Sequence, residues 1–309
     1  MAYSYPFVNA AGENMDIAGV HHFLKSPALV ARRVRDLSRQ KFIADFLLQG
    51  RYDATGGGVA FIVDDAMYAK DEPEVVQAGA EYPLTAVDEG TPEFAPSEKD
   101  GLDSEVYDES IARLLMNPVE RALAKLVNSM IRRVDSKTLA TIASEVTRTH
   151  AAGAAWTTGE QIVEDVLAAD AEFDADDLGL DASVVVLTPG QYAKVAGFFI
   201  KADMVAGGIT DAVAKGAVTG VLGKTWVTSK HVPFTDPMLV DSTALGGIGL
   251  EDLKSPGYVK VPDTLGVETK VQRLAGSDDR DGYRLRVRRV GTAAVIEPRA
   301  ALRITGTSL

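Results

Sequence analysis

The chain has 309 residues, of which 46% are hydrophobic and 25% charged, a composition typical of a folded globular protein with an ample core. Its 44 acidic and 32 basic residues give a formal net charge of −12, which argues against tight binding of DNA or RNA, because such binding depends on neutralising phosphates. The absence of cysteine excludes disulfides and thiolate metal sites. No stretch is apolar for long enough to span a membrane, and the N-terminus lacks the pattern of a secretory signal.

The N-terminal part of the chain is expected to be helical. Residues 23–49 carry apolar side chains at helical spacing, Pro27 suits a first turn, and Gly50 is expected to end the helix. The strand-like runs "VAFIV" (59–63) and "YPLTAV" (82–87) follow, separated by a polar segment. Because this region cannot form a core of its own, we predict a long two-stranded arm that projects from the body and needs a partner to cover it.

Two glycine-containing stretches resemble nucleotide loops. Gly56, Gly57 and Gly58 lack the G-x-G-x-x-G order and precede a strand instead of a helix, so a hinge is favoured over a phosphate loop. The "GKT" at 223–225 resembles the end of a Walker motif, but Val218 replaces the first glycine of that motif and a strand-like run follows. Neither stretch predicts a nucleotide site.

The strongest helix signal begins at Asn117. Asn117 is expected to be the N-cap, with Pro118 at the first helical position and Glu120 completing a capping box. A helix of about thirty residues would be about 45 Å long. Apolar residues recur every three or four positions along it: Val119, Leu123, Leu126, Val127, Met130, Ile131, Val134, Leu139 and Ile142.

After a loose boundary at 148–158, helices and strands alternate, which indicates an α/β subdomain. The last third of the chain alternates apolar and polar residues and predicts several antiparallel strands. The elements expected in the subdomain are helices at 159–173 and 189–199 and strands at 183–189 and 224–232.

No motif demands catalysis or a metal. An acidic turn resembles a calcium-binding loop at Asp174, Asp176 and Gly179, but Leu178 and Val185 stand where two ligands are required. The four histidines lack metal-site spacing, and no G-x-S-x-G nucleophile motif occurs. We therefore predict no catalytic residue, no cofactor and no metal.

The order of these elements resembles the major capsid proteins of tailed bacteriophages, whose Hong Kong 97-type fold is also used by encapsulins. The resemblance extends over nearly the whole chain. It is carried by six stretches in the family's order: "AEYPLTAVDEGTPEF" (80–94), "EKDGLDSEVYDESIARLLM" (98–116), "ERALAKLVNSMIRRVDSKTLATIA" (120–143), "DASVVVLTPGQYAKV" (181–195), "LGKTWVTSKHVP" (222–233) and "RLRVRRVGTAAVIEPRAALRITG" (284–306).

The resemblance implies an α+β fold in five parts. These are an N-terminal arm (1–50), an extended β-hairpin loop (51–95), a peripheral domain with a long spine helix (96–150), an axial α/β domain (151–255) and terminal strands that return to the peripheral domain (256–309).

The resemblance also implies a structural protein without enzymatic activity, which forms a homo-oligomer of hexamers and pentamers. These would build an icosahedral shell around double-stranded DNA, without sequence-specific binding and without a membrane. The shell would be assembled in the host bacterial cytoplasm and become part of the virion. A portal protein and separate scaffolding and cement (decoration) proteins are the expected partners. Scaffolding is expected from a separate protein because arm sequence begins within the first thirty residues.

Site residues follow from the resemblance as expectations. The three glycines Gly56, Gly57 and Gly58 would let the loop swing between an immature and an expanded shell. The candidate inter-subunit contacts are Arg32, Arg33 and Arg35 in the arm and Lys70, Asp71 and Glu72 in the loop.

Some family members form an isopeptide bond between a loop lysine and an asparagine of a neighbouring subunit. Lys70 would suit the lysine role. However, the terminal strands contain no asparagine, and Asp281 and Arg288 occupy the acceptor and assisting positions by rough alignment. We therefore expect a shell without this crosslink.

Two alternatives remain open from the sequence. One is an encapsulin-type compartment with the same fold and a cellular role. The other is an α/β enzyme that uses the Gly- and Ala-rich segment 205–224 as a ligand loop.

Overall fold

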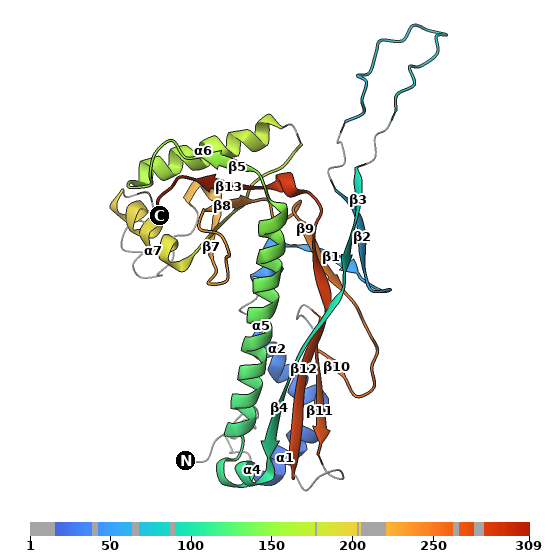
Figure 1. Ribbon diagram of the computed structural model, residues 1–309, viewed down its shortest axis with the longest axis vertical. Coiled ribbons are helices and arrows are strands. Elements are labelled where there is room, and N and C mark those ends of the chain that lie inside the picture. The colour runs from blue at the N-terminus through green and yellow to red at the C-terminus, as the bar shows by residue number, and fades with distance from the viewer. Residues whose placement is uncertain are drawn as a thin grey trace.

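A computed structural model shows an elongated molecule in which one long helix runs from one end of the body to a smaller α/β unit, and a loop projects beyond that unit (Figure 1). The structure describes residues 16–38, 43–63, 68–86, 90–176, 178–202, 204, 221–261, 266–274 and 281–309. Segment 205–220, which forms most of the ligand loop considered for an enzyme, lies outside the described residues.

The N-terminal region forms three short helices where a single one was expected. These are α1 (Ile17–Lys25), α2 (Pro27–Ser38) and α3 (Ala44–Leu47). Ser26 ends α1 with a non-helical backbone, because the proline that follows disfavours a helical conformation in the residue before it. Gly50 does not end a helix. It opens strand β1 (Gly50–Asp53).

The larger sheet is organised around the 14-residue strand β12 (Gly282–Val295). Its first part pairs antiparallel with β4 (Glu98–Tyr107) on one side and β11 (Val267–Arg273) on the other, and its last part pairs with β9 (Gly246–Leu250). Strand β1 adds to β9 in parallel, and β10 (Val259–Lys260) adds to β11. The predicted antiparallel C-terminal strands are thereby confirmed.

The smaller unit is the predicted α/β arrangement. Its sheet has the order β5-β13-β8-β6-β7, and helices α6 and α7 belong to the same unit (Figure 1). Both helices begin with capping boxes, Thr158 with Gln161 and Thr188 with Gln191, which the sequence analysis missed. The bounds are β5 Thr149–Ala151, β13 Ala301–Thr305, β8 Met238–Val240, β6 Val184–Leu187, β7 Thr225–Thr228, α6 Gly159–Ala175 and α7 Pro189–Lys201, with short 3₁₀ turns at Val221–Gly223 and Pro298–Ala300.

The long helix α5 (Asn117–Glu145) has 29 residues, as its periodicity predicts. The expected cap is wrong: Met116 is the N-cap, and no side chain caps the helix. The preceding helix α4 (Asp108–Leu114) is followed by Leu115, whose φ of 53° turns the chain directly into α5.

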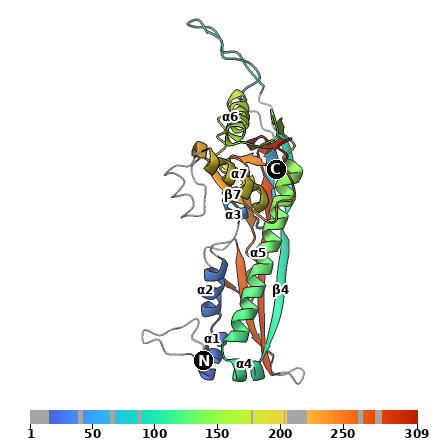
Figure 2. The same ribbon diagram turned by 90° about the vertical axis from the view of Figure 1, so that its left-hand side faces the viewer.

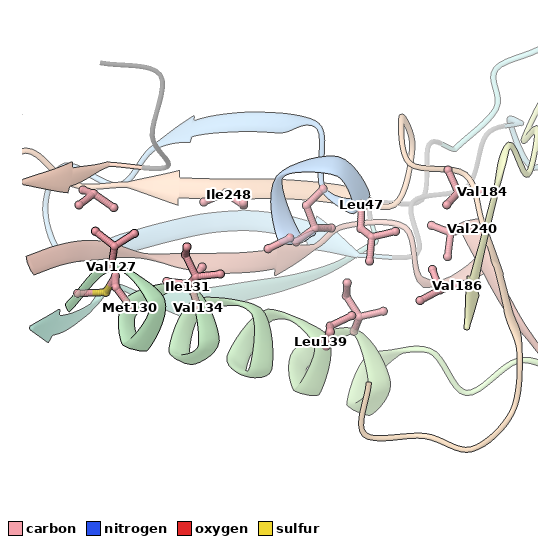
Figure 3. Packing of buried hydrophobic residues seen from close by; sticks show 14 of the residues in the cluster. Leu47, Val127, Met130, Ile131, Val134, Leu139, Val184, Val186, Val240 and Ile248 are labelled. Atoms are coloured by element: carbon pink, nitrogen blue, oxygen red, sulfur yellow. The ribbon is translucent and has the colours of Figure 1, made fainter. Parts of the chain in front are cut away.

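All nine apolar residues predicted for the buried face of α5 are buried. In Figure 3, Val127, Ile131 and Leu139 point from α5 towards the strands and α3. The same hydrophobic cluster includes Ile248 of β9 and Val240 of β8, so it continues from the large sheet into the α/β unit. The two units therefore share one core, with α5 connecting them.

Strand β2 (Gly58–Val63) lies where "VAFIV" predicts it, but the strand that pairs with it is not the predicted one. Residues 82–86 of the expected partner "YPLTAV" form no strand, and residue 87 lies outside the described residues. The partner is β3 (Thr91–Pro96), paired from Gly58–Pro96 to Val63–Thr91. Because β3 contains Pro92 and Pro96, its sequence argues against a strand, and only an edge position tolerates it.

A buried carboxyl joins the N-terminal region to the centre of α5. Asp135 is 2% exposed, and its Oδ1 accepts a hydrogen bond of 3.2 Å from the backbone N–H of Ala44 at the start of α3. Burial raises the pKa of Asp135 to about 6, against the opposing effect of the backbone hydrogen bonds and of Arg289 on β12. Burial likewise lowers the pKa of Arg289 to about 10.

We expect Gly247→Ala to destabilise the subunit strongly. Gly247 lies opposite Gly50 in the parallel β1–β9 pair, and a Cβ on it would lie 2.4 Å from the Gly50 carbonyl. The strands must separate, at a cost of about 1–3 kcal/mol or more. Gly197→Ala in α7 is the matched control: no atom lies within 4 Å of its new methyl group, and the helix should gain about 0.5–1 kcal/mol. Urea unfolding measures both, and equal effects of the two changes would disprove the close approach.

We expect Asp135→Asn to flatten the pH dependence of stability. Because the folded-state pKa of about 6 lies above the ordinary 3.8, the carboxyl stabilises the fold fully below pH 3.8, and this contribution is lost as the pH rises through 6. The loss amounts to about 3 kcal/mol by pH 7.5. Asparagine cannot ionise but still accepts the Ala44 hydrogen bond. Thermal unfolding should therefore show the variant more stable than the wild type at pH 7.5 and similar to it at pH 4; parallel pH profiles would contradict this.

Candidate functional site

The most exposed apolar side chains of the described structure lie on the loop between β2 and β3, which projects away from the body (Figures 1 and 2). Val75 is 100% exposed, Leu84 98% and Tyr82 81%. A side chain of this kind gains about 1.5–3 kcal/mol when it is fully buried. Exposed apolar groups gathered on one projecting segment mark a surface for another molecule.

The three glycines at the base of this loop have two different structural roles. Gly56 and Gly57 form the turn between β1 and β2 with φ values of 104° and 98°, which side-chain-bearing residues rarely adopt, and the Gly57 N–H donates to the Ala54 carbonyl at 3.1 Å. Gly58 lies in β2, where a Cβ would be 2.4 Å from the Phe94 ring. The strand that follows shows that these glycines do not open a helix, as a phosphate loop would require.

The three loop residues that the sequence analysis expected to contact other subunits are exposed. Lys70, Asp71 and Glu72 all lie on the projecting segment. The only hydrogen bond found for them in the described part of the chain joins the Asp71 backbone N–H to Thr85 Oγ1 at 3.3 Å, across the two sides of the loop. Their side-chain charges are therefore available to a partner.

The three arginines of the arm that were expected to contact other subunits differ in their exposure and in their partners. Arg33 on α2 forms an ion pair of 2.6 Å with Glu120 on α5, and the two side chains are 16% and 14% exposed. Burial lowers the pKa of Arg33 and raises that of Glu120. Arg33 thus attaches the arm to the spine helix of its own chain. Arg32 is exposed, and Arg35 is half-buried beside Asp36 at 3.4 Å.

Lys224 of the "GKT" tripeptide has a structural role. Its Nζ lies 2.8 Å from Asp170 Oδ1 on α6 and donates to the Ala182 carbonyl, and its side chain is 6% exposed. Strand β7 follows at once. The lysine therefore joins α6 to the sheet and does not face a phosphate.

The described ranges were compared with two kinds of site, a metal-binding cluster and a membrane-spanning helix. No group of three or more His, Cys, Asp or Glu side chains there is arranged to hold a metal ion. None of the helices in this part of the chain has the length and apolar character needed to cross a membrane.

The face of the large sheet opposite α5 carries ion pairs that the sequence analysis did not identify. Arg284 binds Glu105 at 2.7 Å, Arg286 binds Asp103 at 2.6 Å and Arg288 binds Glu268 at 2.6 Å. The spacing of these arginines, at every second residue of β12, is the signal that could have placed them on one face.

The chain matches the family described as phage capsid protein over residues 91–304, well over half of its length. No curated protein matches it in sequence. Among solved structures, the capsid of cyanophage P-SCSP1u is similar with a TM-score of 0.56 at 15% identity, over 82% of this chain and 84% of the other.

Two further structures share the fold. A phage-related protein from Bordetella bronchiseptica RB50 has a TM-score of 0.59 at 13% identity, over 91% of this chain and 97% of that protein. A virus-like particle from Pyrococcus furiosus has a TM-score of 0.53 at 13% identity, over 89% and 97%. The family match and the shared architecture establish that the chain belongs to the phage capsid protein family and has the Hong Kong 97-type fold of the major capsid proteins of tailed bacteriophages.

Proposed function

We propose that this capsid protein assembles as hexamers and pentamers into an icosahedral shell that encloses the double-stranded DNA of a tailed bacteriophage. The observation that carries the proposal is the projecting loop, whose side chains Val75, Tyr82 and Leu84 are 81% or more exposed. A second copy that covers the loop would bury them and gain free energy from each. Repetition of that contact around a ring builds a closed assembly.

The charge of the chain suits a container for DNA. At a net charge of −12, a shell would repel phosphate or bind it only weakly, so packaged DNA could slide and later leave. Contact with DNA would then be independent of sequence. Assembly would take place in the host bacterial cytoplasm, with a portal protein and separate scaffolding and cement (decoration) proteins as partners. The protein would act as a structural component without enzymatic activity.

The proposed inter-subunit contacts are Arg32 and Arg35 of the arm, together with Lys70, Asp71 and Glu72 of the loop, all of which present at least part of their side chains to solvent. Arg33 would contribute indirectly, because its ion pair with Glu120 holds the arm against α5. In the shell, the subunit would consist of an N-terminal arm (1–50), an extended loop (51–95), a peripheral domain (96–150), an axial domain (151–255) and terminal strands (256–309).

An encapsulin-type compartment is the second candidate, and the similarity to the virus-like particle from Pyrococcus furiosus supports it. The two functions differ in what the shell contains. Particles isolated from their natural host would hold double-stranded DNA in the first case and cargo protein in the second. Nuclease digestion of the contents of opened particles detects the DNA, and a protein gel detects the cargo protein.

We expect the triple variant Val75→Ser, Tyr82→Ser, Leu84→Ser to fold but not to form shells. All three side chains project from the body, so the fold loses little, whereas each subunit contact loses its apolar surface. Leu167→Ser on α6 is the control, since Leu167 is another exposed leucine, 50% accessible and outside the loop. Circular dichroism reports folding, and electron microscopy with light scattering reports assembly. Normal shells from the triple variant would refute the role of the loop.

We expect the double variant Gly56→Pro, Gly57→Pro to block assembly or expansion of the shell. Proline fixes φ near −65°, whereas these glycines have φ values of 104° and 98°, so the loop cannot leave the body in its present direction. Electron microscopy of particles before and after expansion provides the measurement. If the double variant yields normal mature shells, the glycines are not a hinge.

A further inference from the structure

The helices that cover the large sheet are basic, in contrast to the chain as a whole. Helix α2 contains three basic residues and one acidic residue, and α5 contains five and three, so together they carry a net charge of +4 in a chain of −12. The two helices pack against each other on the same face of the sheet. Figure 2 looks onto this helical face, with α2 on one side of α5 and β4 on the other.

Three of these cations form a row along α5, which we call the basic row: Arg121, Lys125 and Arg132. All three are exposed, and their spacing of four and seven residues places them on one side of the helix, away from its buried side. None of the three has an ion pair among the described residues. At 1.5 Å per residue, the row is about 16 Å long.

The other charges in this part of α5 do not compensate the basic row. Glu120 binds Arg33 on α2 at 2.6 Å, and Asp135 is only 2% exposed. Arg133 binds Asp100 on β4 at 3.1 Å. The basic row therefore presents three charges to solvent.

A depression of about 240 Å³ lies beside the first two cations of the row. It is lined by Arg121 and Lys125 of α5 and by Ser104 of β4, among others, so two cations and a hydroxyl group meet there. Its acidic lining residue, Glu105, is already bound by Arg284 at 2.7 Å. An anion with several acceptor oxygens, such as a phosphate group, suits these donors.

The exposed side of α5 lacks the apolar groups that anchor a protein partner. Every residue of α5 is described, and none of its large hydrophobic side chains is exposed. Protein interfaces obtain most of their binding energy from such anchors, whereas a nucleic acid backbone is held by cations and hydroxyl groups. A DNA duplex carries one charge per about 1.7 Å of its axis, so several phosphates lie within the length of the row.

We propose that the basic row of α5 contacts the phosphate backbone of DNA packaged inside the shell, so that the helical face of the subunit lines the interior. The inference rests on the proposed shell function and identifies the surface that the DNA meets. Three contacts per subunit are few, and salt screens them, so each subunit holds the DNA weakly and independently of sequence. The negative charge of the rest of the chain keeps the duplex free to slide.

Photo-crosslinking from a single thiol tests the contact, because the chain contains no cysteine. DNA-filled particles that carry Lys125→Cys are modified with a thiol-reactive aryl azide and illuminated, and protein should become attached to DNA. Lys99→Cys is the matched control. Lys99 is also an exposed lysine without an ion pair among the described residues, but it points to the opposite face of the sheet, because its neighbours Glu98 and Asp100 bind α5.

Attachment from Lys125→Cys alone is the expected result. Attachment from Lys99→Cys alone, or equally from both positions, would overturn the assignment of the helical face to the interior. DNA-filled particles that give attachment from neither position, or attachment to protein instead of DNA, would overturn the contact and leave the shell function intact. Particles of the unaltered protein that contain no DNA would overturn both.

Removal of the three charges tests the energetics on unassembled subunits. Fluorescence anisotropy measures the binding of a short labelled DNA duplex over a range of low salt concentrations. The slope of log affinity against log salt should fall by about 2 to 3, because each phosphate contact contributes about 0.9. The triple variant is Arg121→Gln, Lys125→Gln, Arg132→Gln. Circular dichroism confirms that it is folded.

A control variant removes the same net charge from exposed lysines outside the helical face and should change the slope by less than about 1. Equal changes in the two variants would show that net charge, and not the basic row, governs the binding. Absence of binding by the unaltered subunit at the lowest salt concentration would overturn the contact. The control substitutions are Lys99→Gln, Lys194→Gln and Lys230→Gln.

Discussion

The burial of one face of α5 is the interaction on which the rest of the subunit depends. Val127, Ile131 and Leu139 lie along the same helix, and the core they belong to reaches both the large sheet and the α/β unit. A thin molecule has a large surface for its volume, so it cannot place a separate core in each part. One long helix that contributes to both parts solves this problem.

Three buried charged groups of the body have partners within the chain, whereas the apolar side chains of the projecting loop are exposed to solvent. Asp135 receives the Ala44 N–H, Arg33 binds Glu120, and Lys224 binds Asp170, so each of these three buried groups has a partner of opposite polarity within the chain. Val75 and Leu84 are almost fully exposed. This division suits a building block, because the exposed apolar surface is greatest on the part that projects from the body.

The sequence predicted those features that depend on local patterns. All nine apolar residues that the periodicity of α5 assigned to its inner face are buried, and the alternation of β12 indicated a strand. Features that depend on distant residues were missed. The partner of β2 is a segment with two prolines, whose strand pairing follows from its position at an edge and not from propensity. The ion pair of Arg288 with Glu268 and its stacking on Tyr258 join residues that lie far apart in the sequence, which no local pattern connects.

The positions of the pairing strands also affect when a subunit becomes complete during synthesis. Strand β13, which ends at Thr305, lies inside the smaller sheet between β5 and β8, and β1 pairs with a strand nearly two hundred residues later. A ribosome must therefore synthesise the chain through β12 before the large sheet can close and through β13 before the smaller sheet can close. The helix-rich N-terminal region emerges first but has no finished surface to offer a neighbour. Association of nascent chains is delayed by the topology itself, so the concentration of released, complete subunits controls when assembly begins.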